Sequence, residues 1–146
     1  MSEAYSDQGA IDLTFEASGD LSTKQYFAVK LDSNGQIAVA GAGEKAIGIL
    51  QNKPAAAGRA GTVRVFGVSR MYAGGVIAPG ANVAADAAGE GKTAVANTTD
   101  TQAGAAADPL LGSYVLGISL NVTNTADGDI FPVFINHLGA VPGTVS

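Results

Sequence analysis

Side chains that could carry out chemistry are few in this sequence, and the single histidine, His137, is the first to consider. A Ser-His-acid triad for nucleophilic hydrolysis would depend entirely on this residue, yet no nucleophile-elbow pattern accompanies it. The chain contains no cysteine, which excludes disulfides and thiolate metal sites. We therefore expect His137 to be a structural residue. We predict a protein that is not an enzyme, with no catalytic, cofactor-binding or metal-binding residues.

Three glycine-containing motifs imitate ligand-binding loops without their structural context. Residues 89–93 (Gly-Glu-Gly-Lys-Thr) end like a phosphate-binding loop, but the full pattern needs a glycine where Asp86 stands and a helix after the lysine. Residues 41–43 (Gly-Ala-Gly) begin like a dinucleotide fingerprint but lead into a strand pattern. Residues 127–129 (Asp-Gly-Asp) lack the later glutamate of a calcium loop. We predict turns or loops at all three places and no cofactor.

Acidic residues are concentrated at the start of the chain. The formal net charge is −5, and five acidic residues precede the first basic residue, Lys24. Beyond that point acids and bases are equal in number, so the whole excess lies in the first 20 residues. Two interpretations stay open: a solvated, mobile terminus, or an acidic arm that binds a basic surface of a partner. Because Lys and Arg form no cluster, we expect no nucleic-acid partner.

The sequence also lacks the signals of membrane insertion and export. No apolar run approaches the roughly 18–20 residues of a membrane span. The first seven residues have neither the basic nor the apolar region of a signal peptide. We expect a product that is not secreted and has no membrane partner.

One alternating pattern stands apart near the N-terminus. Residues 10–16 place Ile11, Leu13 and Phe15 on one face of an extended chain and polar residues on the other, which predicts a strand with one buried face. A detached amphipathic strand of this kind either pairs with its own sheet or adds to the open edge of a neighbour. We therefore predict Ile11, Leu13 and Phe15 as partner-binding residues.

The rest of the chain is typical of short strands and turns. Asn34-Gly35 is a hairpin signal, and helix signals are poor because Gly or Pro interrupts most windows. Strands are expected at residues 26–31, 37–39, 47–51, 62–68, 70–72, 114–122 and 130–138, with a short one within 74–83 and a hairpin within 84–108. We predict an all-β fold, a small barrel or sandwich of short antiparallel strands with an extended N-terminal arm. Its parts would be an acidic arm (1–24), a β domain (25–138) and a C-terminal tail (139–146).

A strand–turn–strand pattern also occurs twice, about 68 residues apart. Residues 46–49 (Ala-Ile-Gly-Ile) match residues 115–118 (Val-Leu-Gly-Ile), and residues 61–66 match the region 128–134. In this alignment Ile49 corresponds to Ile118 and Phe66 to Phe134. The repeat indicates a scaffold built from two similar units.

The motifs at residues 26–31, 47–50, 61–65, 73–83, 117–118 and 128–133 together resemble the small capsid cement, or head decoration, proteins of tailed bacteriophages. The similarity spans roughly residues 25–138. It implies a β-barrel-like homotrimer that binds the outer surface of an expanded capsid at three-fold or quasi-three-fold positions and stabilises it. The implied partners are the major capsid protein and further copies of the chain. The implied location is the virion, after synthesis in the cytoplasm of the bacterial host.

Three other classes of function remain open. The chain could be a self-assembling phage tail-tube or surface-fibre subunit, in which the exposed strand completes the sheet of the next copy. A carbohydrate-binding β module is weakened by the absence of Trp and the presence of only four Tyr, because sugar platforms usually need aromatic faces. A hydrolase that depends on His137 is the weakest alternative.

Overall fold

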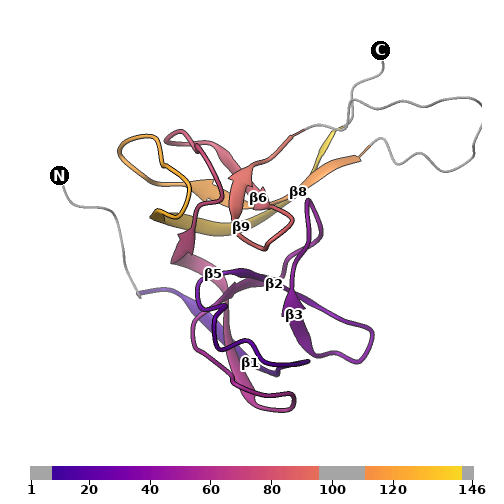
Figure 1. Cartoon of the computed structure of the whole chain (residues 1–146). Coiled ribbons are helices and arrows are strands. Elements are labelled where there is room, and N and C mark those ends of the chain that lie inside the picture. The colour runs from indigo at the N-terminus through magenta and orange to yellow at the C-terminus, as the bar shows by residue number, and fades with distance from the viewer. Residues whose placement is uncertain (1–7, 96–110, 143–146) are drawn as a thin grey trace, which may run out of the picture.

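The structure is a computed structural model that describes residues 8–95 and 111–142, and its regular elements there are all strands (Figure 1). This confirms the predicted all-β class. No helix of the described residues is long and apolar enough to cross a membrane. The strands are β1 Ile11–Glu16, β2 Ala28–Leu31, β3 Ile37–Val39, β4 Gly48–Leu50, β5 Ala60–Tyr72, β6 Asn82–Ala85, β7 Gly91–Thr93, β8 Leu111–Ser119 and β9 Ile130–Pro142.

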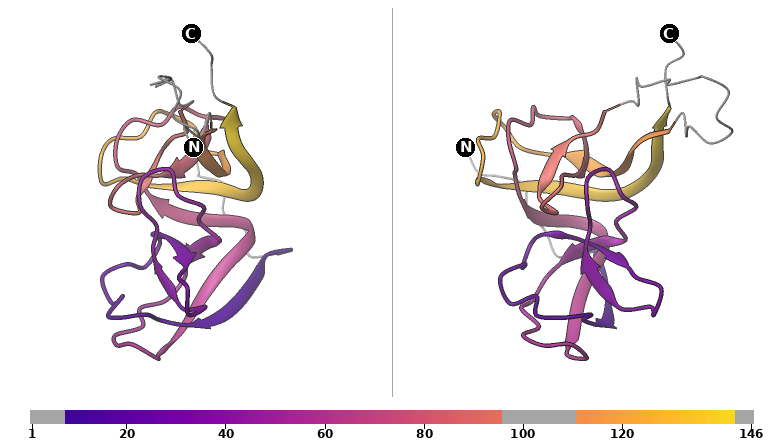
Figure 2. Two further views of the ribbon diagram at one scale, coloured as in Figure 1. Left: turned by 90° about the vertical axis from the view of Figure 1, so that its right-hand side faces the viewer. Right: turned by 45° about the vertical axis from the view of Figure 1, so that its right-hand side comes forward.

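The strands form one antiparallel sheet in the order β3-β2-β4-β5-β9-β8-β6-β7, with β1 also paired to β5. Figure 1 and Figure 2 show the sheet curling into two halves, β1 to β4 in one and β6 to β9 in the other. The result is a half-barrel, open on one side, rather than a closed barrel. Strand β5 runs through both halves and joins them.

Strand β5 is one element of 13 residues where the sequence patterns predicted two, at 62–68 and 70–72. Its first part pairs with β1 and β4, and its second part, from Gly67 onward, pairs with β9. Gly67 has a φ of 105°, which a side chain would disfavour, and a Cβ there would lie 2.9 Å from Cα of Ala10. The glycine therefore bends β5 without ending it and lets the chain before β1 cross closely.

The two halves share one connectivity, a hairpin followed by two further strands: β2-β3-β4-β5 and β6-β7-β8-β9. In each, the glycine of the repeated Ile/Leu-Gly-Ile motif pairs with the first strand of the hairpin, Gly48 with Val29 and Gly117 with Val83. The sequence repeat is thus a structural repeat.

The register of this repeat differs from the sequence alignment. Ile49 pairs with Arg64, and the equivalent Ile118 pairs with Phe134. Phe134 therefore corresponds to Arg64 rather than to Phe66. The alignment matched aromatic letters, whereas the strand pairing places one more residue between Ile118 and Phe134 than between Ile49 and Arg64.

The two halves also share a turn: both hairpins, β2-β3 and β6-β7, turn at an Asp-x-x-Gly sequence. This shared pattern was not identified from the sequence. The carboxylate of Asp32 accepts hydrogen bonds from the backbone N–H groups of Asn34 and Gln36, at 2.8 and 3.0 Å. The carboxylate of Asp86 does the same two and four residues further on, at 2.8 and 2.9 Å. The glycines, Gly35 and Gly89, take φ values of 74° and 84°. The apparent phosphate-loop motif at residues 89–93 is therefore a hairpin turn and strand β7.

The short strand predicted within residues 74–83 does not form, because the chain there is held by a side chain instead of a neighbouring strand. The backbone N–H of buried Ile77 donates to Oγ1 of Thr125 at 2.8 Å, and the Ile77 carbonyl accepts from the Thr125 N–H at 3.1 Å. The loop thus contributes a core residue, and β6 begins only at Asn82.

The core consists of two clusters of buried side chains. The larger draws on both halves and contains Ile49 of β4 together with Met71, Leu116, Phe131 and Ile135, among others. The smaller lies in the first half and consists of Ala17, Leu21, Val29, Ile37, Leu50 and Val63. The larger cluster therefore packs the two halves together.

The ends of the chain contribute more to the sheet than a simple arm and tail would. Strand β1 lies within the segment expected as an arm, and Ala17 and Leu21, which follow it, are buried. Strand β9 continues to Pro142, past the expected start of the tail at residue 139. Residues 1–7 of the expected arm and 143–146 of the expected tail lie outside the described residues.

Replacing either repeated glycine by alanine should disrupt the sheet. A Cβ on Gly48 would overlap the Arg64 carbonyl oxygen, and a Cβ on Gly117 would overlap the Phe134 carbonyl oxygen. Because backbone atoms cannot move aside locally, Gly48→Ala and Gly117→Ala should each lower the free energy of unfolding by at least about 2 kcal/mol. Urea denaturation measures this.

The matched control is Gly75→Ala, where a Cβ would meet nothing within 4 Å. It should leave the unfolding midpoint almost unchanged. A Gly48→Ala variant as stable as this control would show that β4 and β5 do not approach as closely as described.

Candidate functional site

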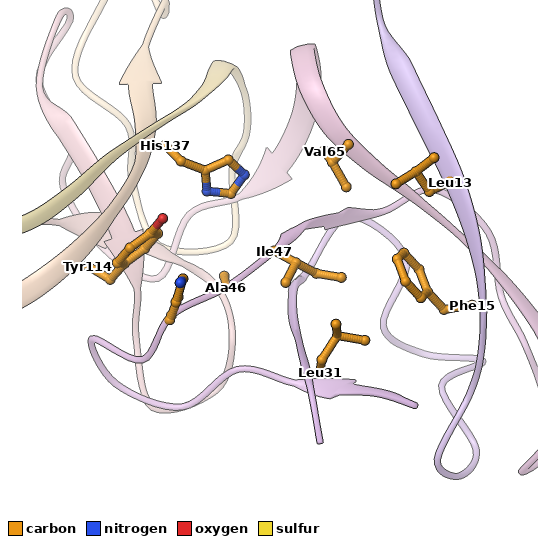
Figure 3. A pocket seen from close by; sticks show the side chains of 9 residues that line it. Leu13, Phe15, Leu31, Ala46, Ile47, Val65, Tyr114 and His137 are labelled. Carbon is orange, nitrogen blue, oxygen red and sulfur yellow. The ribbon is translucent and has the colours of Figure 1, made fainter. Parts of the chain in front are cut away.

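An apolar groove of about 370 Å³ is the first candidate for an interaction site (Figure 3). Strand β1 forms one wall, side chains of β8 and β9 form the opposite wall, and the segment leading into β4 lies between them. The lining residues are Leu13, Phe15, Leu31, Lys45, Ala46, Ile47, Val65, Tyr114 and His137. The groove therefore draws on both halves of the half-barrel.

The structure brings two of the three predicted partner-binding residues to this groove. Leu13 is 46% exposed on its wall, and Phe15 is half-buried between the groove and the smaller core cluster. Ile11 is 50% exposed but does not line the groove. It lies opposite Phe66, which is also exposed and packs edge-on against Phe134 at 5.4 Å between ring centroids. Ile11, Leu13 and Phe15 alternate along β1, so their side chains form an apolar edge of this strand, and the groove lies at the Leu13 and Phe15 end of it.

Strand β1 is fixed to the sheet by an ion pair that crosses to β5. Nε and Nη2 of Arg64 donate to the two carboxylate oxygens of Asp12, at 2.8 and 3.1 Å, and Nη1 donates to the Val68 carbonyl at 2.9 Å. Arg64 is 8% exposed, so the charge is largely removed from water and needs this carboxylate. One acid of the acidic terminus therefore has an internal structural role.

Basic and aromatic side chains gather at the end of the groove away from β1. Nζ of Lys45 lies 5.7 Å from the centroid of the Tyr114 ring, and the His137 ring lies 5.9 Å from the same ring. No Asp or Glu lines the groove within the part of the chain that the structure describes. Sequence reasoning missed Lys45 and Tyr114, because nothing along the chain indicates that residues so far apart meet at one place. The groove thus combines an apolar floor with a basic end.

A second hollow, of about 570 Å³, shares no lining residue with the groove and is more polar. Phe27 and Tyr72 lie within it with ring centroids 5.6 Å apart, and Nζ of Lys24 sits 4.8 Å from the Phe27 centroid. Tyr26, which lies between Lys24 and Phe27 in the sequence, has a φ of 68°. It is the one non-glycine residue with a left-handed backbone among those described. Glu90 also lines the hollow.

The pKa of Glu90 is raised above its ordinary value, chiefly because burial disfavours the charged carboxylate. The negative charges of Asp86 and Asp127 act in the same direction, and Lys24 opposes them. Among the described residues, no group of three or more His, Asp or Glu is placed to hold a metal ion. In this hollow the charged form of the Glu90 carboxylate is therefore unfavourable.

No protein-family model matches the sequence, and no curated protein matches it significantly. A solved structure does match the fold: the N base of the head fiber protein gp8.5 of bacteriophage phi29. The TM-score is 0.57 at 14% sequence identity, and the match covers 87% of this chain and 94% of that chain. The two chains share a fold.

The match with the phi29 base extends over nearly the whole half-barrel. Because nearly the whole of the phi29 base is covered, the likeness concerns the complete architecture rather than one recurrent hairpin. Identity this low shows nothing about individual binding residues. The groove residues of this chain therefore have to be judged by their own chemistry.

Removing the carboxylate of Asp12 should loosen β1. Asp12→Ala leaves the Arg64 guanidinium without its two charge-assisted hydrogen bonds, although Asp12 itself is partly exposed. We expect a loss of about 1–2 kcal/mol in the free energy of unfolding. Hydrogen exchange should accelerate at the amides of residues 12–16. Glu16→Ala, an exposed acid at the end of the same strand, is the control and should change neither quantity. Equal behaviour of the two variants would contradict a fixing role for Asp12.

Replacing Glu90 by glutamine should stabilise the protein in a pH-dependent way. Since its pKa is raised in the folded state, the charged carboxylate disfavours folding once the pH rises through that pKa. Below the pKa of the unfolded chain the carboxyl group is neutral in both states and costs nothing. Glu90→Gln should therefore raise the urea midpoint more at about pH 7 than at about pH 4. A gain that is the same at both pH values, or larger at the lower one, would contradict this.

Proposed function

We propose that this protein is a structural component of a tailed-phage virion, which binds the outer surface of the capsid and stabilises it. In this proposal it acts as a homotrimer at three-fold or quasi-three-fold positions, with the major capsid protein as its partner, and carries out no chemistry. The observation that carries the proposal is the shared fold with the head fiber base of phage phi29, which extends over 94% of that chain.

Two further observations support a role based on surfaces. The sequence motifs over residues 25–138 resemble those of capsid cement proteins. In addition, the half-barrel leaves large apolar side chains exposed along one edge and groove, among them Ile11, Leu13 and Leu31. Apolar patches of this kind mark sites of protein–protein interaction.

Trimerisation would make weak capsid contacts effective. Each copy offers one edge strand and one groove, a modest area for stable binding on its own. Three linked copies bind with a high effective concentration after the first contact, so the combined affinity far exceeds that of one copy. A trimer also matches the symmetry of the local three-fold axes of a capsid.

A second candidate is a fibre subunit. It is favoured because the phi29 protein that shares the fold is the N base of a head fiber. In that case the half-barrel would form the base of a projecting fibre instead of a contact that links neighbouring capsid subunits. The two candidates differ in what the purified protein does: a fibre or tube subunit polymerises end to end, whereas a cement protein stays a closed oligomer until it meets a capsid.

Co-sedimentation with expanded capsids of its own phage tests the proposed function. The natural chain should sediment with the capsids and raise their resistance to heat. Ile11→Asp, which places a charge on the exposed apolar edge, should fold normally and bind at least about tenfold more weakly. Val76→Asp is the control, because Val76 is 68% exposed and lies on a loop outside the edge and the groove.

Three results would contradict the proposal. The natural chain could fail to sediment with capsids, or Val76→Asp could lose binding as strongly as Ile11→Asp. Filaments of the purified protein in negative-stain electron micrographs would favour the fibre subunit instead.

A further inference from the structure

The groove has the features of a binding site for an extended polypeptide. Its walls include two strand edges that are open among the described residues: β1 pairs only with β5, and β9 beyond Ile135 pairs only with β8. Extended peptides commonly bind by adding to such an edge and placing alternate side chains in adjacent pockets. An apolar floor of Ala46, Ile47 and Val65 lies between the two edges.

The charge of the groove narrows the choice of occupant. Among residues 8–95 and 111–142, the basic side chains that line the groove are Lys45 and His137, and no acidic side chain lines it. Lys45 forms no salt bridge with a carboxylate of the same residues. The peptide that fits is therefore acidic, with at least one apolar or aromatic side chain for the floor.

A segment of the chain itself has this composition. Residues 1–7 read Met-Ser-Glu-Ala-Tyr-Ser-Asp. In an extended conformation, alternate residues share one face, so Glu3, Tyr5 and Asp7 would point the same way with the aromatic ring between two carboxylates. This order matches an apolar floor with a basic end.

The path of β1 favours the groove of another copy over the groove of the same chain. Figure 3 shows β1 on the opposite side of the groove from His137, and Ile11, at the start of β1, no longer lines the groove. The close approach of Ala10 to Gly67 places the chain before β1 beside the bend of β5. Seven extended residues reach about 24 Å, enough to arrive at a neighbouring copy.

We propose that residues 1–7 of one copy bind in the groove of the next copy, with Tyr5 on the apolar floor and one of its flanking carboxylates, that of Glu3 or Asp7, beside Lys45 and His137. This inference rests on the self-association in the proposed function and names the contact that produces it. Exchanged around a closed ring, the segments would link all copies through identical contacts.

A disulfide trap tests the contact, because the natural chain has no cysteine. The variant Glu3→Cys/Leu31→Cys places one thiol on the same face of the segment as Tyr5 and the other on the groove wall, where Leu31 is 43% exposed. Tyr5 and Asp7 stay in place. Under mild oxidation, non-reducing electrophoresis should show covalent dimers and trimers. Glu3→Cys/Val76→Cys and the two single-cysteine variants are controls and should remain mostly monomeric.

Charge reversal gives a second readout. Lys45→Glu should weaken self-association at least about tenfold, and adding Glu3→Lys and Asp7→Lys should restore most of it. The proposal is overturned by three results: a disulfide within single chains only, no disulfide beyond that of the controls, or undiminished association of Lys45→Glu.

Light scattering on the natural chain separates this inference from the proposed function. A mass of three chains without cross-links would overturn the groove contact alone. A monomer would overturn both the contact and the proposed preformed trimer.

Discussion

The bend of β5 at Gly67 is the constraint on which the arrangement of the molecule depends. Before the bend β5 pairs with β1 and β4, and after it with β9, so one strand belongs to both halves of the half-barrel. Because the bend separates β1 from β9, their edges stay open and the groove forms between them. A residue with a side chain at position 67 would meet Ala10 and an unfavourable φ, so the interaction surface follows from a single glycine.

Local patterns were enough to predict the fold class and most strands. The alternation of residues 10–16 gave β1, and the repeated Gly-Ile motif marked two similar halves, which the pairing of Gly48 and Gly117 confirms. Long-range features could not be predicted in the same way. The meeting of Lys45 with Tyr114 depends on the curl of the whole sheet, and the loop at Ile77 is held by a threonine 48 residues away. The turn at residues 32–35 was predicted from its Asn-Gly signal, and a turn or loop was predicted at residues 89–93. The Asp-x-x-Gly pattern that the two hairpins share was not noticed.

Stability and binding use the same few groups in different ways. Of the acids near the N-terminus, Asp12 neutralises the buried Arg64 and thereby fixes β1 as a wall of the groove. Because the two core clusters are small, covering the groove and the exposed edge would add apolar burial that one copy lacks, which links assembly to stability. A scaffold of this kind is suited to act after it has docked on a larger structure.

The proposed function places three copies of the protein on the capsid exterior. Electron cryomicroscopy of expanded capsids incubated with the purified chain would reveal them. We expect added density at three-fold or quasi-three-fold positions, into which three half-barrels fit with their grooves covered. Capsids without added density, or single half-barrels at the base of projecting fibres, would contradict the proposed function.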